Sequence, residues 1–352
     1  MGNMTHNWFS ITHVSAALLL AAAAFLTCAS PKTIIDTKPD FGKANVYLTG
    51  SLCKVWLNGT LQTYYGTSGN TGWAFGNSIF VSDGNVYVAG HDRWPPHQFA
   101  GFWKNGAWHR LCDRDGFAEA HSVFVSDGSV YVAGYEQNEA GTDVATLWVN
   151  STSQWLGDGK WRSNAYSVFV SGDDVYVAGD DAEPPGYAML WKNGVRQRLE
   201  MGGDGRYGHG YSVFVSNGDV YVAGTDFDGW PRAVLWKNGV AQCLQDNADA
   251  TSVFVEGKDV YVAGNTKGNA GKLVALLWKN GEAHYLGDPN DPVCETYARS
   301  VFVLDGDTYV AGDEIGDGNH PVLWLNGKKY SPTSDGWNGM ATSVFVTEKR
   351  KR

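Results

Sequence analysis

Short apolar and polar segments alternate along this chain in a unit that recurs seven times. Each unit reads Ser-Val-Phe-Val, a turn rich in Asp and Gly, Val-Tyr-Val-Ala-Gly, a variable loop, and Leu-Trp-Lys-Asn-Gly. The two valine-rich segments are apolar on both faces, which predicts strands buried between neighbouring units. The segment after Asn-Gly is more polar and alternating, as expected for an outer strand. Each unit therefore predicts a four-stranded antiparallel sheet, and in six of the seven units Asn-Gly forms the hairpin turn.

The tryptophan of the third segment sets the period. The seven copies are 42 to 47 residues apart, at Trp56, Trp103, Trp148, Trp191, Trp236, Trp278 and Trp324. This period is typical of a four-stranded propeller blade. The first Val-Tyr segment, at residues 46–50, has no Ser-Val-Phe-Val before it, and the last Ser-Val-Phe-Val, at residues 343–346, has no Val-Tyr segment after it. The two ends complete one unit together, which predicts a closed ring of seven blades.

On these motifs, residues 44–347 resemble seven-bladed β-propellers, an all-β fold. The unit is similar to repeats in secreted bacterial proteins of unassigned function. It lacks the Gly-His and Trp-Asp pattern of the WD40 family and the Gly-Gly pattern of kelch repeats. A β-solenoid is the alternative fold, but its rungs would be shorter and split end repeats would serve no purpose there.

Three segments outside residues 44–347 complete the predicted organisation. Residues 1–28 predict a signal peptide, because the apolar run Val14–Leu26 is too short to span a bilayer and suits a secretory leader. Cys28 lies where a bacterial lipoprotein cysteine would lie, so we expect either a lipid anchor there or cleavage without one. Residues 29–43 predict a linker and 348–352 a basic tail. The expected location is secreted or at the outer cell surface.

Charge and cysteine content limit the partners that we expect. The net charge of −10 disfavours a nucleic-acid partner, because an acidic surface repels phosphate backbones. Membrane contact is expected only through a lipid at Cys28, and the propeller is expected to be monomeric. No zinc or redox Cys-x-x-C spacing occurs. The remaining cysteines occupy unlike positions of the repeat and predict no disulfide pairing: Cys53, Cys112, Cys243 and Cys294.

Positions that are alike in all units are explained by blade packing, so candidate functional residues are sought where the units differ. The loops after the second and fourth segments vary most and leave the sheets on the same face. Five tryptophans lie in these loops: Trp73, Trp94, Trp161, Trp230 and Trp337. Exposed tryptophans can stack on sugars or anchor a protein partner, whereas packed ones would pin their own loops.

Two further sets of variable residues are expected on the same face. The second residue after the Gly of Val-Tyr-Val-Ala-Gly is acidic in five units: Asp92, Glu136, Asp181, Asp226 and Glu314. We favour loop capping for these carboxylates over ligand binding. The residue before Ser-Val-Phe-Val should lie near the top of the central channel: Asn77, His121, Tyr166, Tyr211, Thr251, Arg299 and Thr342. Variation in this fixed frame suits a binding pocket or an unconstrained exposed site.

The sequence carries few signals of catalysis or metal binding. No nucleophile elbow or phosphate-binding loop occurs, and we expect no cofactor. The Asp-x-Asp-Gly fragments at 113–116 and 226–229 are incomplete calcium loops, so calcium is a minor alternative. A metal site built from His91, Asp92, His97 and His121 is another minor alternative.

The main functional hypothesis is a binding or scaffold protein whose loop face takes a glycan or an extracellular protein. One alternative is a glycosidase or lyase that uses Asp181, Asp226 or Glu314 as acid and base, although no pair of them is distinguished. Another alternative is a structural surface protein without a small ligand.

Overall fold

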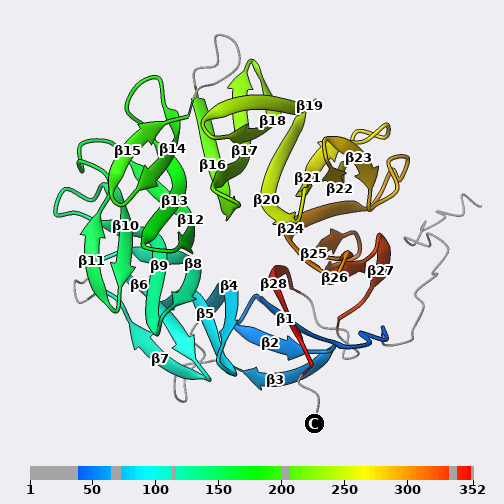
Figure 1. The fold of residues 1–352 in the computed structure, drawn as a ribbon, viewed down its shortest axis with the longest axis horizontal. Coiled ribbons are helices and arrows are strands. Elements are labelled where there is room, and N and C mark those ends of the chain that lie inside the picture. The colour runs from blue at the N-terminus through cyan, green and yellow to red at the C-terminus, as the bar shows by residue number, and fades with distance from the viewer. Residues whose placement is uncertain (1–38, 65–72, 113–115, 200–206, 333–338, 350–352) are drawn as a thin grey trace, which may run out of the picture.

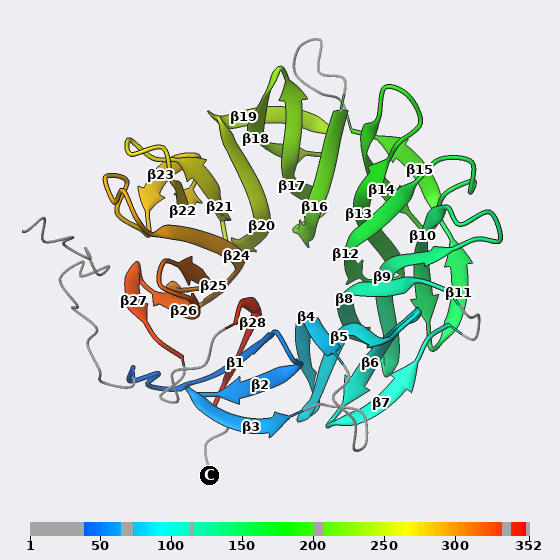
Figure 2. The same cartoon turned by 180° about the vertical axis from the view of Figure 1, so that it is seen from behind.

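The computed structural model describes residues 39–64, 73–112, 116–199, 207–332 and 339–349. Within these ranges the chain forms β-strands and no helix. The strands make seven four-stranded antiparallel sheets arranged as blades around one axis (Figures 1 and 2). The protein is therefore an all-β, seven-bladed β-propeller, which confirms the prediction from the repeat.

Blades are numbered here in the order in which their second strands follow along the chain. Blade 1 contains β28 (Ala341–Glu348), β1 (Ala44–Gly50), β2 (Lys54–Leu57) and β3 (Thr60–Tyr64). Blade 2 contains β4 (Trp73–Ser82), β5 (Asn85–Trp94), β6 (His97–Lys104) and β7 (Ala107–Arg110). Blade 3 contains β8 (Ala118–Ser126), β9 (Ser129–Gln137), β10 (Asp143–Val149) and β11 (Thr152–Trp155). Blade 4 contains β12 (Ser163–Ser171), β13 (Asp174–Asp181), β14 (Tyr187–Lys192) and β15 (Val195–Arg198).

The other three blades follow the same order from the inner to the outer strand. Blade 5 contains β16 (Tyr207–Ser216), β17 (Asp219–Asp228), β18 (Trp230–Lys237) and β19 (Val240–Asp246). Blade 6 contains β20 (Ala248–Glu256), β21 (Asp259–Lys267), β22 (Leu273–Lys279) and β23 (Glu282–Tyr285). Blade 7 contains β24 (Glu295–Leu304), β25 (Asp307–Ile315), β26 (Asn319–Leu325) and β27 (Lys328–Tyr330).

Blade 1 closes the ring by joining distant parts of the chain. Its inner strand β28 comes from the C-terminal part and pairs antiparallel with β1 (Figure 1). The register runs from Ala44 opposite Glu348 to Gly50 opposite Ala341. The split unit predicted from the sequence is therefore one complete blade.

The Asn of the hairpin turn has the same structural role in every blade. Its backbone φ lies between 48° and 54°, in the left-handed region that Asn tolerates better than most residues. Its side-chain oxygen accepts a hydrogen bond from a backbone N–H near the start of the second strand, at 2.8–2.9 Å. The Asn thus shapes the turn and fixes it to the second strand, so its recurrence is explained by folding.

Neighbouring blades are joined by a repeated hydrogen bond and by buried tryptophans. The Ser of Ser-Val-Phe-Val accepts a hydrogen bond from a backbone N–H on the inner strand of the next blade, at 3.1–3.3 Å around the whole ring. The seven repeat tryptophans are at most 2% exposed. Burying a large aromatic side chain contributes several kcal/mol, roughly 3–5 by truncation to Ala.

Each inner strand contains a β-bulge at one equivalent position. In blade 3, Ala120 pairs with Gly134 and Ser122 with Ala133, so His121 has no partner in the ladder. The same shift occurs in the other six blades. The bulge brings a carbonyl oxygen of the inner strand to within 1.7–2.0 Å of where a Cβ on the opposing glycine would be. This close approach explains the Gly that ends Val-Tyr-Val-Ala-Gly.

The Phe of Ser-Val-Phe-Val faces the axis of the ring. The seven rings contact one another in a closed circle, with neighbouring centroids 4.6–5.0 Å apart. We call this set the phenylalanine collar: Phe80, Phe124, Phe169, Phe214, Phe254, Phe302 and Phe345. All seven rings are half-buried.

Candidate functional site

The bulge positions carry the side chains that the sequence placed near the top of the channel. All seven side chains are half-buried, at the loop end of the inner strands. We call the region that they surround the channel mouth. The structure thus brings together Asn77, His121, Tyr166, Tyr211, Thr251, Arg299 and Thr342.

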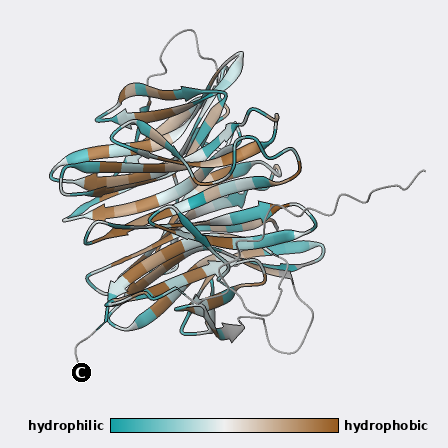
Figure 3. Ribbon diagram, turned by 90° about the vertical axis from the view of Figure 1, so that its right-hand side faces the viewer, coloured by the Kyte–Doolittle hydropathy of each residue, from teal (hydrophilic) through white to brown (hydrophobic). Residues whose placement is uncertain are grey.

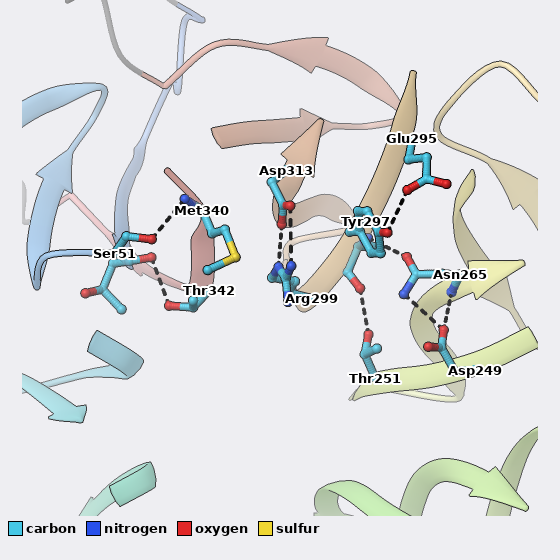
Figure 4. A network of polar contacts seen from close by, with 12 residues as sticks. Ser51, Asp249, Thr251, Asn265, Glu295, Tyr297, Arg299, Asp313, Met340 and Thr342 are labelled. Atoms are coloured by element: carbon cyan, nitrogen blue, oxygen red, sulfur yellow. Dashed lines mark hydrogen bonds and ion pairs between the residues drawn. The ribbon is translucent and has the colours of Figure 1, made fainter. Parts of the chain in front are cut away.

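The channel mouth has an aromatic arc and a polar arc. The aromatic arc spans blades 3 to 5, where His121 stacks on Tyr166 at 5.3 Å and Tyr166 contacts Tyr211 at 5.4 Å between ring centroids. The polar arc consists of the bulge residues of blades 6, 7, 1 and 2. It includes Thr251 and Arg299, which Figure 4 shows together with Thr342.

Hydrogen bonds hold the polar arc in place. Thr251 Oγ1 lies 2.8 Å from the carbonyl oxygen of Ala298 on the next blade, and Thr342 Oγ1 lies 2.6 Å from that of Gly76. Arg299 forms an ion pair with Asp313, which is fully buried (Figure 4). Each of these side chains is therefore fixed before any ligand arrives.

Glu119 organises the mouth between blades 2 and 3. Its Oε1 accepts a hydrogen bond from Asn77 at 2.9 Å and lies 3.2 Å from His91 Nδ1 and 3.8 Å from His121 Nε2. Its Oε2 accepts a bond from Gln98 at 3.3 Å. Burial raises the pKa of Glu119, but the His91 hydrogen bond, the two histidine charges and Asn77 outweigh it and lower the pKa to about 2. This carboxylate is therefore ionised at any ordinary pH.

Asp180 has the corresponding role beneath the aromatic arc. It accepts hydrogen bonds from the Tyr166 hydroxyl at 2.9 Å and from Asn164 Nδ2 at 3.0 Å, and it pairs with His209 of the next blade. His209 in turn stacks on Tyr211 at 5.3 Å. Burial, followed by the charge of Asp180 and its hydrogen bond, raises the pKa of Tyr166, so its hydroxyl stays protonated.

A further carboxylate lies beside the polar arc. Asp249 accepts hydrogen bonds from both the backbone and the side-chain nitrogen of Asn265 at 3.0 Å (Figure 4). Asn265 also accepts a bond from the backbone N–H of Ala298, which links blade 6 to blade 7. Burial outweighs these bonds and raises the pKa of Asp249. The mouth therefore contains acidic groups on both arcs.

The loop carboxylates singled out in the sequence do not converge on the mouth. Asp181 pairs with Arg196 at 2.9 Å and Asp226 with Arg232 at 2.8 Å, and the arginines belong to the outer half of the same blade. Two of the other three also have a side-chain partner within their own blade: Glu136 accepts a hydrogen bond from Trp155, and Glu314 pairs with Lys329. The third, Asp92, is buried, with 4% of its surface exposed. Loop capping was favoured for these carboxylates, and Asp181 also accepts a hydrogen bond from the backbone N–H of Glu183 at 2.8 Å. Asp226 and Glu314 form side-chain ion pairs instead.

The residue one place earlier in the second strand reaches the mouth instead. His91, Asp180, Asn265 and Asp313 directly follow the glycine, and each contacts a bulge residue, the strand segment before it or the next blade. Successive side chains of a strand point to opposite faces, so the two residues after the glycine cannot share one environment. In the sequence, the second residue after the glycine forms a regular acidic series and therefore stood out. The first residue after the glycine differs in chemistry from blade to blade, so no pattern marked it.

Two of the five loop tryptophans are described with their side chains. Trp161 is 46% exposed before β12, and Trp230 is 72% exposed at the start of β18. The side chains of Trp73 and Trp94, and the whole of Trp337, lie outside the described part of the chain. Among the described side chains, the predicted surface of exposed loop tryptophans is therefore represented by Trp161 and Trp230.

Several other predictions concern residues that lie partly or wholly outside the described ranges. Cys28 and residues 1–28 lie outside them, as do residues 113–115 of the first calcium fragment. Among the described residues, no group of three or more His, Cys, Asp or Glu side chains is placed so that it could hold a metal ion. The described ranges also contain no helix that could cross a membrane. In the described ranges no disulfide bond joins any two of the four cysteines, Cys53, Cys112, Cys243 and Cys294.

Comparisons with known proteins bear on the fold alone, and of three similar structures the one with a TM-score of 0.50 supports it. No protein-family model and no curated protein matches the chain. A Mycobacterium tuberculosis puromycin-hydrolyzing peptidase matches with a TM-score of 0.50 and 10% identity, over 78% of this chain and 51% of the peptidase. YCF48 bound to D1 peptide matches with a TM-score of 0.46 and 9% identity, over 88% and 90% of the two chains. A thermostable family-43 glycoside hydrolase gives 0.36 and 12%, over 65% and 98%. This chain spans about half the length of the peptidase.

Proposed function

We propose that this protein is a binding protein whose ligand is a carbohydrate held at the channel mouth. The observation that carries the proposal is the aromatic arc of His121, Tyr166 and Tyr211 opposite a polar arc that includes Thr251 and Arg299. Sugars have apolar C–H faces that pack on aromatic rings and hydroxyls that exchange hydrogen bonds with polar side chains. A mouth with both kinds of wall suits such a ligand.

The rigidity of the mouth supports binding of a small ligand. Glu119 and Asp180 are each held by three or more polar contacts, and these contacts orient the side chains of both arcs. Ordering a flexible side chain at an interface costs roughly 0.5–1.5 kcal/mol. Because these side chains are already fixed, little of the interaction energy is lost on ordering them.

The geometry favours binding over glycoside hydrolysis. Asp181, Asp226 and Glu314 are ion-paired within their own blades, which does not suit an acid/base pair that must exchange protons. Glu119 has a pKa of about 2 and would be a poor general acid. We therefore place the enzyme hypothesis second.

A glycan array probed with the purified protein, with and without calcium, tests the proposal. We expect a defined group of glycans to bind, and a Tyr166→Ala, Tyr211→Ala variant to lose roughly tenfold or more in affinity, since aromatic contacts contribute about 0.5–1.5 kcal/mol each. The matched control is Trp161→Ala, Trp230→Ala, which removes two exposed rings from the rim. A blank array under both conditions would refute carbohydrate binding and favour a protein ligand. Loss of binding in the rim variant alone would move the site away from the mouth.

A further inference from the structure

The phenylalanine collar surrounds an apolar lumen on the axis of the propeller. Seven centroids spaced 4.6–5.0 Å apart in a closed circle lie about 5.5 Å from its centre. An aromatic ring extends about 1.4 Å from its centroid, and carbon contacts add about 1.9 Å. Neighbouring ring planes are tilted by 45–57°, close to the one-seventh turn between blades, and rings lying flat against the lumen would overlap at this spacing. Each ring therefore turns an edge to the axis, and a free radius of about 2 Å remains.

This width selects what can occupy the lumen. A single unbranched alkyl chain has a radius of about 2 Å, whereas a branched chain or two chains side by side would be too wide. Water would also fit by size, but it finds no hydrogen-bond partner on the phenylalanine rings. An alkyl chain would bury both its own surface and that of the rings, so replacing water with it is favourable.

Polar positions bound the collar along the axis. Two residues before Phe80, toward the mouth, is Ser78, whose hydroxyl accepts the hydrogen bond from the next blade. The position two residues after the collar Phe is polar in six blades and apolar in blade 7: Ser82, Ser126, Ser171, Ser216, Glu256, Thr347 and, in blade 7, Leu304. Strands rise about 3.4 Å per residue, so the apolar band is roughly 7 Å long, the length of about six methylene groups.

We propose that the collar binds the alkyl chain of an amphipathic ligand, a single-chain glycoside whose sugar lies in the channel mouth. The choice of headgroup rests on the proposed function, whereas the choice of chain rests on the collar. The two regions are continuous, because His121 of the mouth and Phe124 of the collar are three residues apart on β8. The ligand therefore enters from the loop face with its polar end outermost.

Calorimetric titration of the protein with two series of probes tests this inference. The first series is the n-alkyl β-D-glucopyranosides with one, two, four, six and eight carbons, below their micellar concentrations. The second is the n-alkanols with two, four, six and eight carbons. We expect the Kd to fall by about two- to fourfold per methylene up to about six carbons in both series, and then to level off at the length of the collar.

The possible outcomes test binding of the alkyl chain and binding of the sugar headgroup separately. A Kd independent of chain length, or one that keeps falling through eight carbons, would overturn the collar proposal even if glucosides bind. A chain-length dependence with equal Kd for glucosides and alkanols would support the collar and contradict glucose as the headgroup. Binding of the methyl glucoside without a chain-length effect would leave the mouth as the only binding region.

Variants of opposite collar residues provide an independent check. Phe80→Trp with Phe214→Trp narrows the lumen and should abolish the chain-length dependence, whereas Phe80→Leu widens it and should preserve that dependence. Overpacking costs roughly 1–3 kcal/mol, so circular dichroism must show that the Trp variant is folded. If that variant does not fold, the Leu variant and the wild-type series still decide. Unchanged chain-length dependence in a folded Trp variant would place the alkyl chain elsewhere.

Discussion

Replacing Glu119 with Gln should destabilise the protein in a way that depends on pH. The substitution keeps an amide oxygen that Asn77 can reach, but it removes the charge that faces His91 and His121. It also places an NH2 group beside donors that now point at a carboxylate oxygen, including Gln98 Nε2. The variant should therefore lose stability without any change in side-chain volume.

The size of the effect follows from the pKa of Glu119, which the fold lowers from 4.5 to about 2. Each pKa unit corresponds to about 1.4 kcal/mol, so a pKa that is lower by about 2.5 gives at most about 3.5 kcal/mol. The side chain is 23% exposed, so solvent screening reduces this to about 2 kcal/mol. Because the folded pKa is the lower one, the contribution is present above pH 4.5 and is lost as the pH falls toward 2.

Urea unfolding at several pH values between 2 and 7 measures this effect. We expect Glu119→Gln to lower the free energy of unfolding by about 2 kcal/mol at pH 7 and by close to nothing at pH 2. The control is Asp127→Asn in an exposed turn, which should change stability by less than about 0.5 kcal/mol at either pH. An equal loss at pH 2 and pH 7 would show that packing, and not the ionised carboxylate, is what the substitution removes.

Two further predictions concern the repeated elements and are also measured by urea unfolding. Gly134→Ala should cost about 3 kcal/mol, because the new Cβ would lie 1.9 Å from the carbonyl oxygen of Glu119, whereas Gly116→Ala meets open space and should be neutral. Neutral behaviour of Gly134→Ala would mean that the bulge adapts easily. Asn193→Ala should cost about 2 kcal/mol, since it loses the bond from Val175 and strains a φ of 51°. Asn193→Gly keeps the conformation and should cost about half as much; equal costs would exclude backbone strain as a cause.

The sequence predicted the blades because their strands and turns carry strong local signals. The tryptophan period, the Asn-Gly turns and the split unit at residues 46–50 and 343–346 sufficed for the number of blades and the closure of the ring. Inner strands proved longer than Ser-Val-Phe-Val. In blade 3, for example, β8 begins at Ala118 and not at Ser122. The added residues alternate, because Ala118 and Ala120 are buried in the core between blades whereas Glu119 and His121 lie at the mouth.

The bulges and the phenylalanine collar could not be predicted from the sequence pattern. A bulge adds one residue without a typical composition, so the sequence could place His121 near the channel but could not show that it leaves the ladder. Phe124 was interpreted as part of blade packing, yet it faces the axis and meets Phe80 and Phe169. Only the three-dimensional register decides which of two successive side chains, such as Asp180 or Asp181, reaches the mouth.

The bulges give the protein seven positions that strand pairing does not constrain, although the side chains of Thr251, Arg299 and Thr342 also bond to neighbouring parts of the propeller. At each one, the ladder resumes on both sides, so Tyr211 or Thr251 can be exchanged with little cost to strand pairing. The backbone around them stays constant, and each side chain enters from a different direction. The mouth thus offers seven side-chain positions on one constant backbone, and a new ligand specificity could arise by single substitutions at these positions while the propeller itself stays the same.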